Sequence, residues 1–174
     1  MIKIILFIFI SALLTLFSWS SLKSFRSHGF FRFFAFECIL ILVLLNSDFW
    51  FHNPFSFQQI ISWLLLVTSI FLAVHGFYLL RFVGKPRENF EDTTALVKVG
   101  AYQYIRHPLY SSLFIGAWGA SLKQISIFSV ILVLLTTGFL IATAKVEEAE
   151  NLNKFGDAYA DYINESKMFI PFLF

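Results

Sequence analysis

Long apolar runs dominate the chain, and short segments between them hold most of its charged residues. A helix needs about 20 mostly apolar residues to cross roughly 30 Å of hydrocarbon. Five runs approach that length: Ile4–Leu22, Phe33–Phe51, Phe57–Leu80, Leu109–Leu122 extended backwards to Tyr104, and Ile125–Ala144. Only Lys123 and Gln124 separate the last two runs, so their helices are expected to form a tight antiparallel hairpin. The pattern predicts an all-α polytopic membrane protein with about five transmembrane helices.

The segment after the fifth run, Lys145 to Phe174, has a different periodicity. Its apolar residues recur at steps of three and four, which is typical of an amphipathic helix: Val146, Ala149, Leu152, Phe155, Tyr159 and Tyr162. Acidic residues dominate the opposite face. The pattern predicts an amphipathic cytosolic C-terminal helix that continues the fifth span. Such a helix can lie along the headgroups, but this does not explain why acids dominate a face beside anionic lipid.

Composition supports the membrane class. The chain is 58% hydrophobic and 14% charged, with a mean hydropathy of +0.75, whereas a soluble domain carries about 25% charged residues. These values exclude a disordered chain, a collagen-like repeat and a coiled coil. The net charge of +2 does not indicate a nucleic-acid partner. Cys38 is the single cysteine, so no disulfide within the chain and no cysteine-based metal site is expected.

Basic residues predict the orientation. With the N-terminus outside, every Lys and Arg except Lys3 and Lys123 falls on the inner side. No small-residue cleavage site follows the first run, so we interpret it as a retained anchor. We expect one membrane domain over residues 1–174, with a three-span part (1–81) and a cofactor-binding part (82–174). A prokaryotic cell membrane is the expected location, and no obligate protein partner is evident.

The densest set of special residues is the segment Gly100–Tyr110, at the cytosolic start of the fourth span. Pro108 fixes its own φ and disfavours α conformation at His107, so a helix is expected to begin near Pro108. Free backbone N–H groups beside Arg106 and His107 then suit a carboxylate or phosphate. The alternative is a proline-started membrane helix whose arginine contacts phosphate headgroups.

A second cluster, Glu147, Glu148 and Glu150, lies at the cytosolic end of the fifth span. The hairpin predicts that Glu147 and Glu148 are neighbours of Arg106, His107 and Tyr110. Such a site suits a cofactor with a zwitterionic or cationic polar head and an apolar acceptor that approaches from the bilayer. The alternative is a salt bridge between Arg106 and either glutamate, without a ligand.

Two more ionisable residues fall inside predicted spans, where such residues are functional hypotheses by default. Glu37 and His75 both lie close enough to the interface for their polar groups to reach it. We expect a structural role for Glu37 and leave a structural or functional role open for His75.

At these residues the chain resembles the superfamily of isoprenylcysteine carboxyl methyltransferases and phospholipid N-methyltransferases, in particular its small prokaryotic-type membrane members. The resemblance covers about Thr93 to Pro171 and is carried by an ordered set: Leu96-Val97, Gly100-x-Tyr102-x-Tyr104-x-Arg106-His107-Pro108-x-Tyr110, Glu147-Glu148, Phe155-Gly156-x-x-Tyr159-x-x-Tyr162 and Ile170-Pro171.

The resemblance implies methyl transfer from S-adenosylmethionine at the cytosolic boundary, to a lipid-like or prenylated small acceptor. The superfamily's cofactor positions correspond to Thr94, Ala95, Leu96, Val97, Tyr102, His107, Pro108, Leu109, Tyr110 and Glu147. The candidate catalytic residues are Arg106, His107, Glu147 and Glu148, and no metal is implied. If the acceptor is an amine or hydroxyl, Glu148 or His107 is the expected base.

The chain departs from the prenylcysteine-type pattern at the position of an arginine thought to address the substrate carboxylate, where it has Thr143. Lys145 or Lys167 is left as a substitute. Two other interpretations stay open: an NADPH-dependent reductase of the sterol or steroid type, and a non-catalytic lipid-binding scaffold.

Overall fold

The computed structural model describes residues 1–85 and 93–174. Arg87, one of the basic residues predicted on the inner side, lies outside these ranges. The described chain consists of the helices α1 (Ile2–Leu22), α2 (His28–Asn46), α3 (Phe57–Phe82), α4 (Pro108–Ser121), α5 (Ile127–Phe155) and α6 (Asp157–Glu165), with short 3-10 turns at η1 (Ser47–Phe49) and η2 (Gly100–Gln103). Four of them, α1, α2, α3 and α5, are long and apolar enough to cross a membrane. The prediction of an all-α polytopic membrane protein is confirmed.

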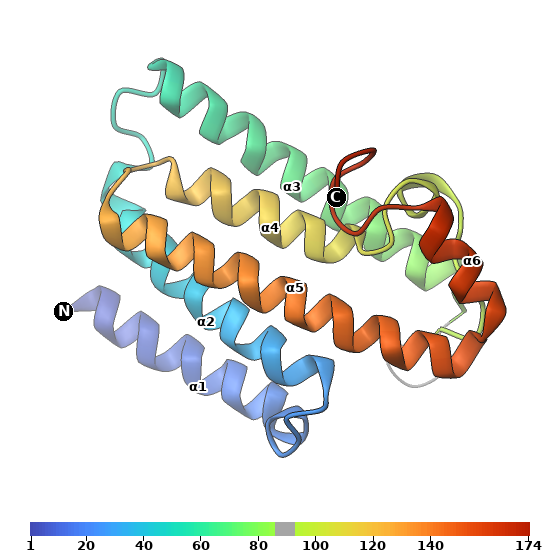
Figure 1. The fold of residues 1–174 in the computed structure, drawn as a ribbon. Coiled ribbons are helices and arrows are strands. Elements are labelled where there is room, and N and C mark those ends of the chain that lie inside the picture. The colour runs from blue at the N-terminus through green and yellow to red at the C-terminus, as the bar shows by residue number, and fades with distance from the viewer. Residues whose placement is uncertain (86–92) are drawn as a thin grey trace.

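The long helices lie side by side in one bundle (Figure 1). Helix α2 packs on α1 and α5, while α4 packs on α3 and α5. The N-terminus and the α4–α5 turn lie at one end, where Lys3 and Asp48 form an ion pair at 2.7 Å. Helix α6 folds over the opposite end, which we call the α6 end.

Three serines explain where long helices begin. Ser27, Ser56 and Ser126 precede α2, α3 and α5, and each accepts a hydrogen bond from a backbone N–H of the first turn. A serine side chain in this position satisfies one of the donors that a helix start leaves without an internal partner. Glu37 has the structural role expected of it, because its carboxylate accepts a hydrogen bond from Ser11 Oγ at 2.9 Å and joins α2 to α1.

Helix α4 is shorter than the sequence indicates. It has 14 residues, which corresponds to about 21 Å at 1.5 Å per residue, less than the roughly 30 Å of a membrane core. Within residues 1–85 and 93–174, the structure therefore does not confirm a fifth full span. Pro108 is the first residue of α4, so the residues from Tyr104 to His107 lie outside the helix.

Polar side chains complete the C-terminal end of α4. Four donors from α2 and α3 reach the last carbonyl oxygens of α4 and of the turn after it, at 2.5–3.1 Å: Ser62 to Gly119, Asn46 to Ala120, Gln58 to Leu122, and Gln59 to Lys123. An unpaired carbonyl in hydrocarbon costs several kcal/mol. These bonds therefore allow a short helix to end inside the bundle.

Lys123 is buried in the same region. Its Nζ donates to Gln59 Oε1 at 3.0 Å and lies 3.6 Å from the centre of the Trp63 ring, and its exposed fraction is 3%. The predicted hairpin turn thus places its lysine between aromatic rings rather than in water.

The C-terminal tail is not one continuous helix. Gly156, with φ of +57°, ends α5, and α6 turns back over the bundle (Figure 1). The apolar face identified from the sequence is divided at this glycine, and its tyrosines Tyr159 and Tyr162 are buried in the protein. The predicted helix continues the fifth span as far as Phe155 and is interrupted at Gly156, because that residue adopts a backbone conformation that helices do not continue through.

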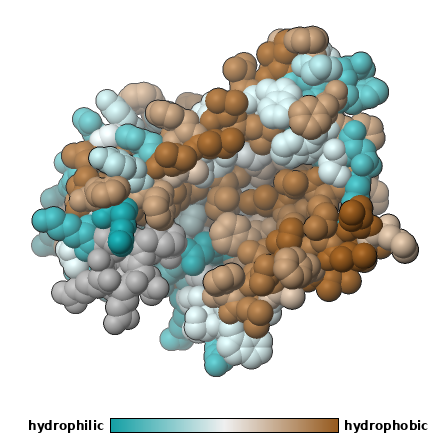
Figure 2. Space-filling view, turned by 180° about the vertical axis from the view of Figure 1, so that it is seen from behind, coloured by the Kyte–Doolittle hydropathy of each residue, from teal (hydrophilic) through white to brown (hydrophobic). Residues whose placement is uncertain are grey.

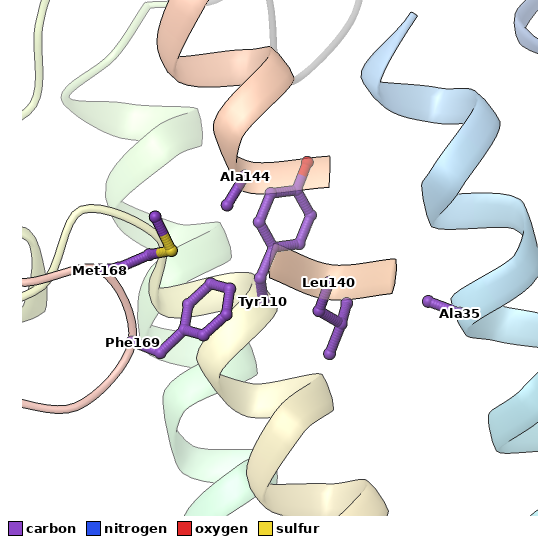
Figure 3. Close-up of a cluster of buried hydrophobic side chains, with 6 residues drawn as sticks. All are labelled: Ala35, Tyr110, Leu140, Ala144, Met168 and Phe169. Atoms are coloured by element: carbon purple, nitrogen blue, oxygen red, sulfur yellow. The ribbon is translucent and has the colours of Figure 1, made fainter. Parts of the chain in front are cut away.

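The chain after α6 pairs with the segment that precedes α4. Arg106 N donates to Lys167 O at 2.7 Å, and Lys167 N donates to Tyr104 O at 3.0 Å. Met168 and Phe169 then enter a buried cluster with Tyr110, Leu140, Ala144 and Ala35 (Figure 3). This pairing brings the two halves of the motif into one site.

Candidate functional site

A cavity lies at the α6 end, between the ends of α3 and α5 and the start of α4. Its lining comes from two stretches of the chain, residues 80–110 and 147–162: Leu80, Thr93, Leu96, Val97, Tyr102, Arg106, His107, Leu109, Tyr110, Glu147, Asn151, Phe155, Tyr159 and Tyr162. One wall is therefore polar and charged, and the rest is aromatic and aliphatic.

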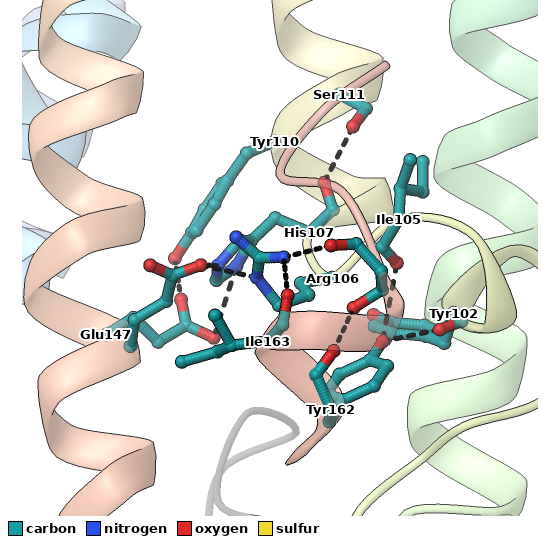
Figure 4. A network of polar contacts seen from close by, with 11 residues as sticks. Tyr102, Ile105, Arg106, His107, Tyr110, Ser111, Glu147, Tyr162 and Ile163 are labelled. Atoms are coloured by element: carbon teal, nitrogen blue, oxygen red, sulfur yellow. Dashed lines mark hydrogen bonds and ion pairs between the residues drawn. The ribbon is translucent and has the colours of Figure 1, made fainter. Parts of the chain in front are cut away.

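The hairpin brings Tyr110 and Glu147 together, as the sequence predicts. The Tyr110 hydroxyl donates to Glu147 Oε2 at 2.5 Å, from the first turn of α4 to the part of α5 that lies at the α6 end. The Glu147 side chain lines the cavity and retains 26% exposure. This leaves a fixed carboxylate facing the cavity (Figure 4).

His107 lies between the two glutamates. Its Nε2 is 3.4 Å from Glu148 Oε1, without the geometry of a hydrogen bond, and its Nδ1 is 3.9 Å from Glu147 Oε1. The ring stacks on Tyr110 with centroids 5.5 Å apart, and only 3% of the side chain is exposed. Pro108 holds His107 out of the helix (φ −124°, ψ 63°), so the imidazole lies at the cavity wall.

Arg106 joins α5 to the tail. Its Nε donates to Glu148 Oε1 at 2.6 Å, and its Nη1 donates to Ile163 O at 3.1 Å and to Ser166 O (Figure 4). The salt bridge that the sequence left as an alternative is thus present for Glu148. Glu148 Oε1, the atom that pairs with Arg106, also faces His107. Glu147, in contrast, is the glutamate that lines the cavity.

The backbone N–H groups of Arg106 and His107 themselves are engaged by the chain end. They donate to Lys167 O at 2.7 Å and Met168 O at 3.3 Å. The sequence does not reveal that the chain end returns to this segment. An anion at the site would therefore depend on side chains more than on these two donors.

Several residues implied by the resemblance lie outside the cavity. Thr94 is exposed and its hydroxyl donates to Lys85 O at 2.9 Å, while Ala95 N donates to Gly84 O at 3.2 Å. Thr93 lines the cavity in their place. Pro108 is buried but does not line the cavity.

Thr143, at the position of the missing arginine, and the two possible substitutes, Lys145 and Lys167, also lie outside the cavity. Thr143 is fully buried and donates to Phe139 O of its own helix at 2.8 Å. Lys145 and Lys167 are exposed and do not line the cavity. None of the three provides a positive charge at the cavity.

The sequence reasoning missed six lining residues: Leu80, Thr93, Asn151, Phe155, Tyr159 and Tyr162. Asn151 follows Glu147 by one helical turn, and this spacing was a usable signal. The aromatic residues Phe155, Tyr159 and Tyr162 were recognised as an apolar helix face and as part of the family motif, but they were not assigned to the site. Tyr162 donates its hydroxyl to Tyr102 O at 2.5 Å, and burial raises the pKa of Tyr159 and Tyr162 well above the usual value. They form a neutral aromatic wall.

His75 supports the site from α3 without lining the cavity. Its Nε2 accepts a hydrogen bond from Ala101 N at 3.4 Å. The adjacent Gly100 has φ of +60°, and a Cβ there would lie 2.8 Å from His75 Nε2. This close approach fixes η2, which carries the buried Tyr102.

The arrangement offers hydrogen-bond and charge partners for an organic ligand. Within residues 1–85 and 93–174, no group of three or more His, Cys, Asp or Glu side chains is placed to hold a metal ion. A partly exposed carboxylate beside several aromatic rings suits a cationic group attached to a flat ring system.

Residues 57–170 match the phospholipid methyltransferase family, and this range contains every residue that lines the cavity. The chain belongs to this family. It is therefore a member of the membrane methyltransferases that the sequence motifs resemble, and its apolar helices and this membership make it an integral membrane protein.

The chain is also similar to three proteins named methanethiol S-methyltransferase. It is 30% identical to the one from Crocosphaera subtropica over 65% of this chain and 44% of that protein. It is 27% identical to the one from Bradyrhizobium diazoefficiens over 63% of this chain and 39% of that protein. It is 23% identical to the one from Pseudomonas sp. over 64% of this chain and 43% of that protein. The chain spans less than half the length of these relatives.

Proposed function

We propose that this protein transfers a methyl group from S-adenosylmethionine to an apolar acceptor at the membrane boundary. The observation that carries the proposal is the Glu147 carboxylate, held by Tyr110 and facing a cavity with aromatic walls. Membership of a methyltransferase family supports it.

The donor set of the cavity fits this cofactor. Glu147 suits the α-ammonium group or the sulfonium, and the rings of Tyr102, Tyr110 and Tyr159 suit an adenine. The imidazole of His107, which lines the cavity, suits the α-carboxylate. When bound, S-adenosylmethionine supplies a methyl group whose bond to sulfur breaks as its bond to the acceptor forms.

The residues of this chain position the reactants. Tyr110 fixes the Glu147 carboxylate, and Arg106 fixes the tail so that Tyr159 and Tyr162 cover the cavity and exclude water. Such alignment is the main requirement of a displacement reaction. For an amine or thiol acceptor, the proton would pass to His107 or Glu147, because Arg106 already engages Glu148.

Two kinds of acceptor deserve a test. The names of the relatives favour a small thiol such as methanethiol. An apolar hollow between α1, α2, α3 and α4, whose lining includes Leu14, Phe36 and Leu113, favours a lipid-like acceptor that enters from the bilayer. We favour the lipid-like acceptor, methylated at a carboxyl oxygen or an amine.

The first experiment is calorimetric binding of S-adenosylhomocysteine to the detergent-purified protein. We expect a micromolar Kd for the wild type. Glu147→Gln and His107→Ala should each raise the Kd at least tenfold, because each removes a charged or buried partner of the ligand. Glu150→Gln is the matched control, since Glu150 lies on the same helix and pairs with His28 instead. If the folded wild type binds NADPH and not S-adenosylhomocysteine, the reductase interpretation replaces ours; if it binds neither, the scaffold interpretation does.

We also propose that the cavity faces the cytosol of a prokaryotic cell, with the N-terminus outside. Ser24 lies in the loop between α1 and α2, at the predicted inner side. In a Cys38→Ala background, Ser24→Cys should resist a membrane-impermeant maleimide in intact cells and react after lysis. Labelling of intact cells would reverse the orientation.

A further inference from the structure

Helix α5 presents three residues of different polarity to the cavity. Glu147, Asn151 and Phe155 follow one another at steps of four residues, and all three line the cavity. Residues at this spacing lie on the same side of a helix, about 6 Å apart along its axis. We call these three residues the α5 stripe. Along it the cavity wall changes from a carboxylate to a carboxamide and then to an aromatic ring.

Asn151 occupies the middle of the α5 stripe. Its side-chain amide contacts the Tyr159 hydroxyl of α6. A carboxamide has two N–H donors and an oxygen with two lone pairs, so one contact with a tyrosine leaves capacity for a ligand. Among the described residues that line the cavity, Asn151 is the only carboxamide. A neutral group that both donates and accepts suits hydroxyl groups better than an ion.

The two ends of the α5 stripe lie in different surroundings. Tyr110, whose hydroxyl donates to Glu147, lines both the cavity and the apolar hollow between α1, α2, α3 and α4. Hydrophobic side chains surround this hollow on the face that Figure 2 shows. Phe155 is the last residue of α5, where α6 folds over the cavity. A ligand that follows the stripe therefore has one end beside the hollow and the other beneath α6.

The order of groups along the α5 stripe matches the order of groups in S-adenosylmethionine. The sulfonium and the α-ammonium group suit the carboxylate at one end, and the adenine suits the aromatic ring at the other. The ribose joins these two parts and carries two neighbouring hydroxyls. Proteins bind such hydroxyls with side-chain oxygens of Asp or Glu, and the oxygen of Asn151 offers the same kind of acceptor.

We propose that Asn151 binds the ribose hydroxyls of S-adenosylmethionine, and that the α5 stripe sets the direction in which this cofactor lies. This rests on the proposed function and adds a binding residue and an orientation to it. The adenine lies at the Phe155 end, beneath α6. The sulfonium and its methyl group lie beside Glu147 and Tyr110, on the side of the hollow from which the acceptor arrives.

The test compares two ligands that differ in the ribose alone, S-adenosylhomocysteine and its 2′,3′-dideoxy analogue, by calorimetry with the detergent-purified protein. The wild type should bind S-adenosylhomocysteine at least tenfold more tightly, because the analogue leaves a buried polar group unpaired. Asn151→Leu should raise the Kd of S-adenosylhomocysteine at least tenfold and leave that of the analogue nearly unchanged. Asn151→Asp keeps an acceptor oxygen and should retain the preference.

Two further variants serve as the matched control and as a safeguard against misfolding. Asn153 is an exposed asparagine of the same helix that does not line the cavity, so Asn153→Leu should change neither Kd. Asn151→Ala adds no bulk and should give the same result as Asn151→Leu if the leucine prevents folding. Thermal unfolding of each variant shows that the measured protein is folded.

A second pair of measurements separates the two ends of the α5 stripe. The compound 5′-methylthioadenosine keeps the ribose and the adenine but lacks the amino-acid end. Glu147→Gln should weaken S-adenosylhomocysteine, leave 5′-methylthioadenosine nearly unchanged and keep the preference for the hydroxyls. Asn151→Leu should weaken both of these ligands. Tyr159→Phe, which removes the hydroxyl that Asn151 contacts, should keep the preference for the hydroxyls.

The outcomes separate this assignment from the proposed function. If the wild type binds S-adenosylhomocysteine and its dideoxy analogue equally, or if Asn151→Leu weakens both by the same factor, the role of Asn151 is to hold α6, its assignment to the ribose is overturned, and the proposed function stands. If Glu147→Gln abolishes the preference for the hydroxyls, the orientation is overturned. If S-adenosylhomocysteine does not bind to the folded wild type, the proposed function fails and the assignment of Asn151 fails with it.

Discussion

Arg106 is the residue whose replacement most directly tests the architecture of the site. Arg106→Met removes an ion pair of 2.6 Å with Glu148, in which the two side chains are only 9% and 14% exposed, and two bonds to the tail carbonyls of Ile163 and Ser166. Breaking a buried pair by removing one partner costs about 3–5 kcal/mol. His107, at 3.4 Å from Glu148, offers partial compensation, so we expect a value near 3 kcal/mol.

The assay is thermal unfolding in detergent, followed by fluorescence. A loss of about 3 kcal/mol corresponds to a fall in Tm of roughly 6–12 °C for a chain of this size. The double variant Arg106→Met/Glu148→Gln should recover about 2 kcal/mol, because it leaves no unpaired buried charge. Lys3→Met is the control: it breaks an equally short pair with Asp48 whose side chains are 40% and 71% exposed, and surface pairs contribute about 0–1 kcal/mol.

The same variants show whether Arg106 acts on the fold or on the ligand. We expect Arg106→Met to increase proteolysis after α5, because α6 and the tail lose their attachment. An Arg106→Met protein with unchanged Tm and abolished S-adenosylhomocysteine binding would refute this reasoning, and would make Arg106 a ligand contact instead.

Three further predictions follow from single positions. Gly100→Ala should lower the free energy of unfolding by at least about 1–2 kcal/mol and weaken S-adenosylhomocysteine binding, because φ is +60° and the new Cβ meets His75. Gly138→Ala is the control, since nothing lies within 4 Å of its Cβ. Equal effects of the two variants on calorimetric binding and on unfolding would contradict the prediction. Burial raises the pKa of Tyr159 and Tyr162, so the unfolded chain releases these protons before the folded one does, and stability should fall above about pH 10 by roughly 1.4 kcal/mol per pH unit for each of the two. In a pH series of unfolding, Tyr159→Phe should have a shallower slope, and an unchanged slope would contradict the prediction. Ser62→Ala leaves the carbonyl of Gly119 without its side-chain donor and should lower stability by about 1–3 kcal/mol, whereas exposed Thr68→Ala should not.

Much of the fold follows from local chemistry. Apolar runs of spanning length, serine caps and Pro108 are readable along the chain, and they set the all-α membrane class and the start of α4. The short turn after α4 makes an antiparallel hairpin necessary, and from it the proximity of Arg106 and Tyr110 to the glutamates could be predicted and is confirmed.

Other features depend on contacts between distant segments. The length of α4 depends on donors from α2 and α3 that satisfy its last carbonyls, so hydropathy alone overestimates it. Glu147 and Glu148 are adjacent in sequence and chemically identical, yet one faces the cavity and the other pairs with Arg106. Only the helix rotation, set by packing, distinguishes them.

The sequence by itself determined the membrane class, the helix hairpin and the residues that carry the family motif, because hydropathy, helix caps and turn length act over a few residues. The tertiary structure decided that the tail returns over the site, that the backbone N–H groups of Arg106 and His107 donate to this returning tail, and that Leu109 and Tyr110 line both the cavity and an apolar hollow between the helices. These outcomes arise from packing between segments more than 50 residues apart in the sequence, and no local pattern encodes such packing.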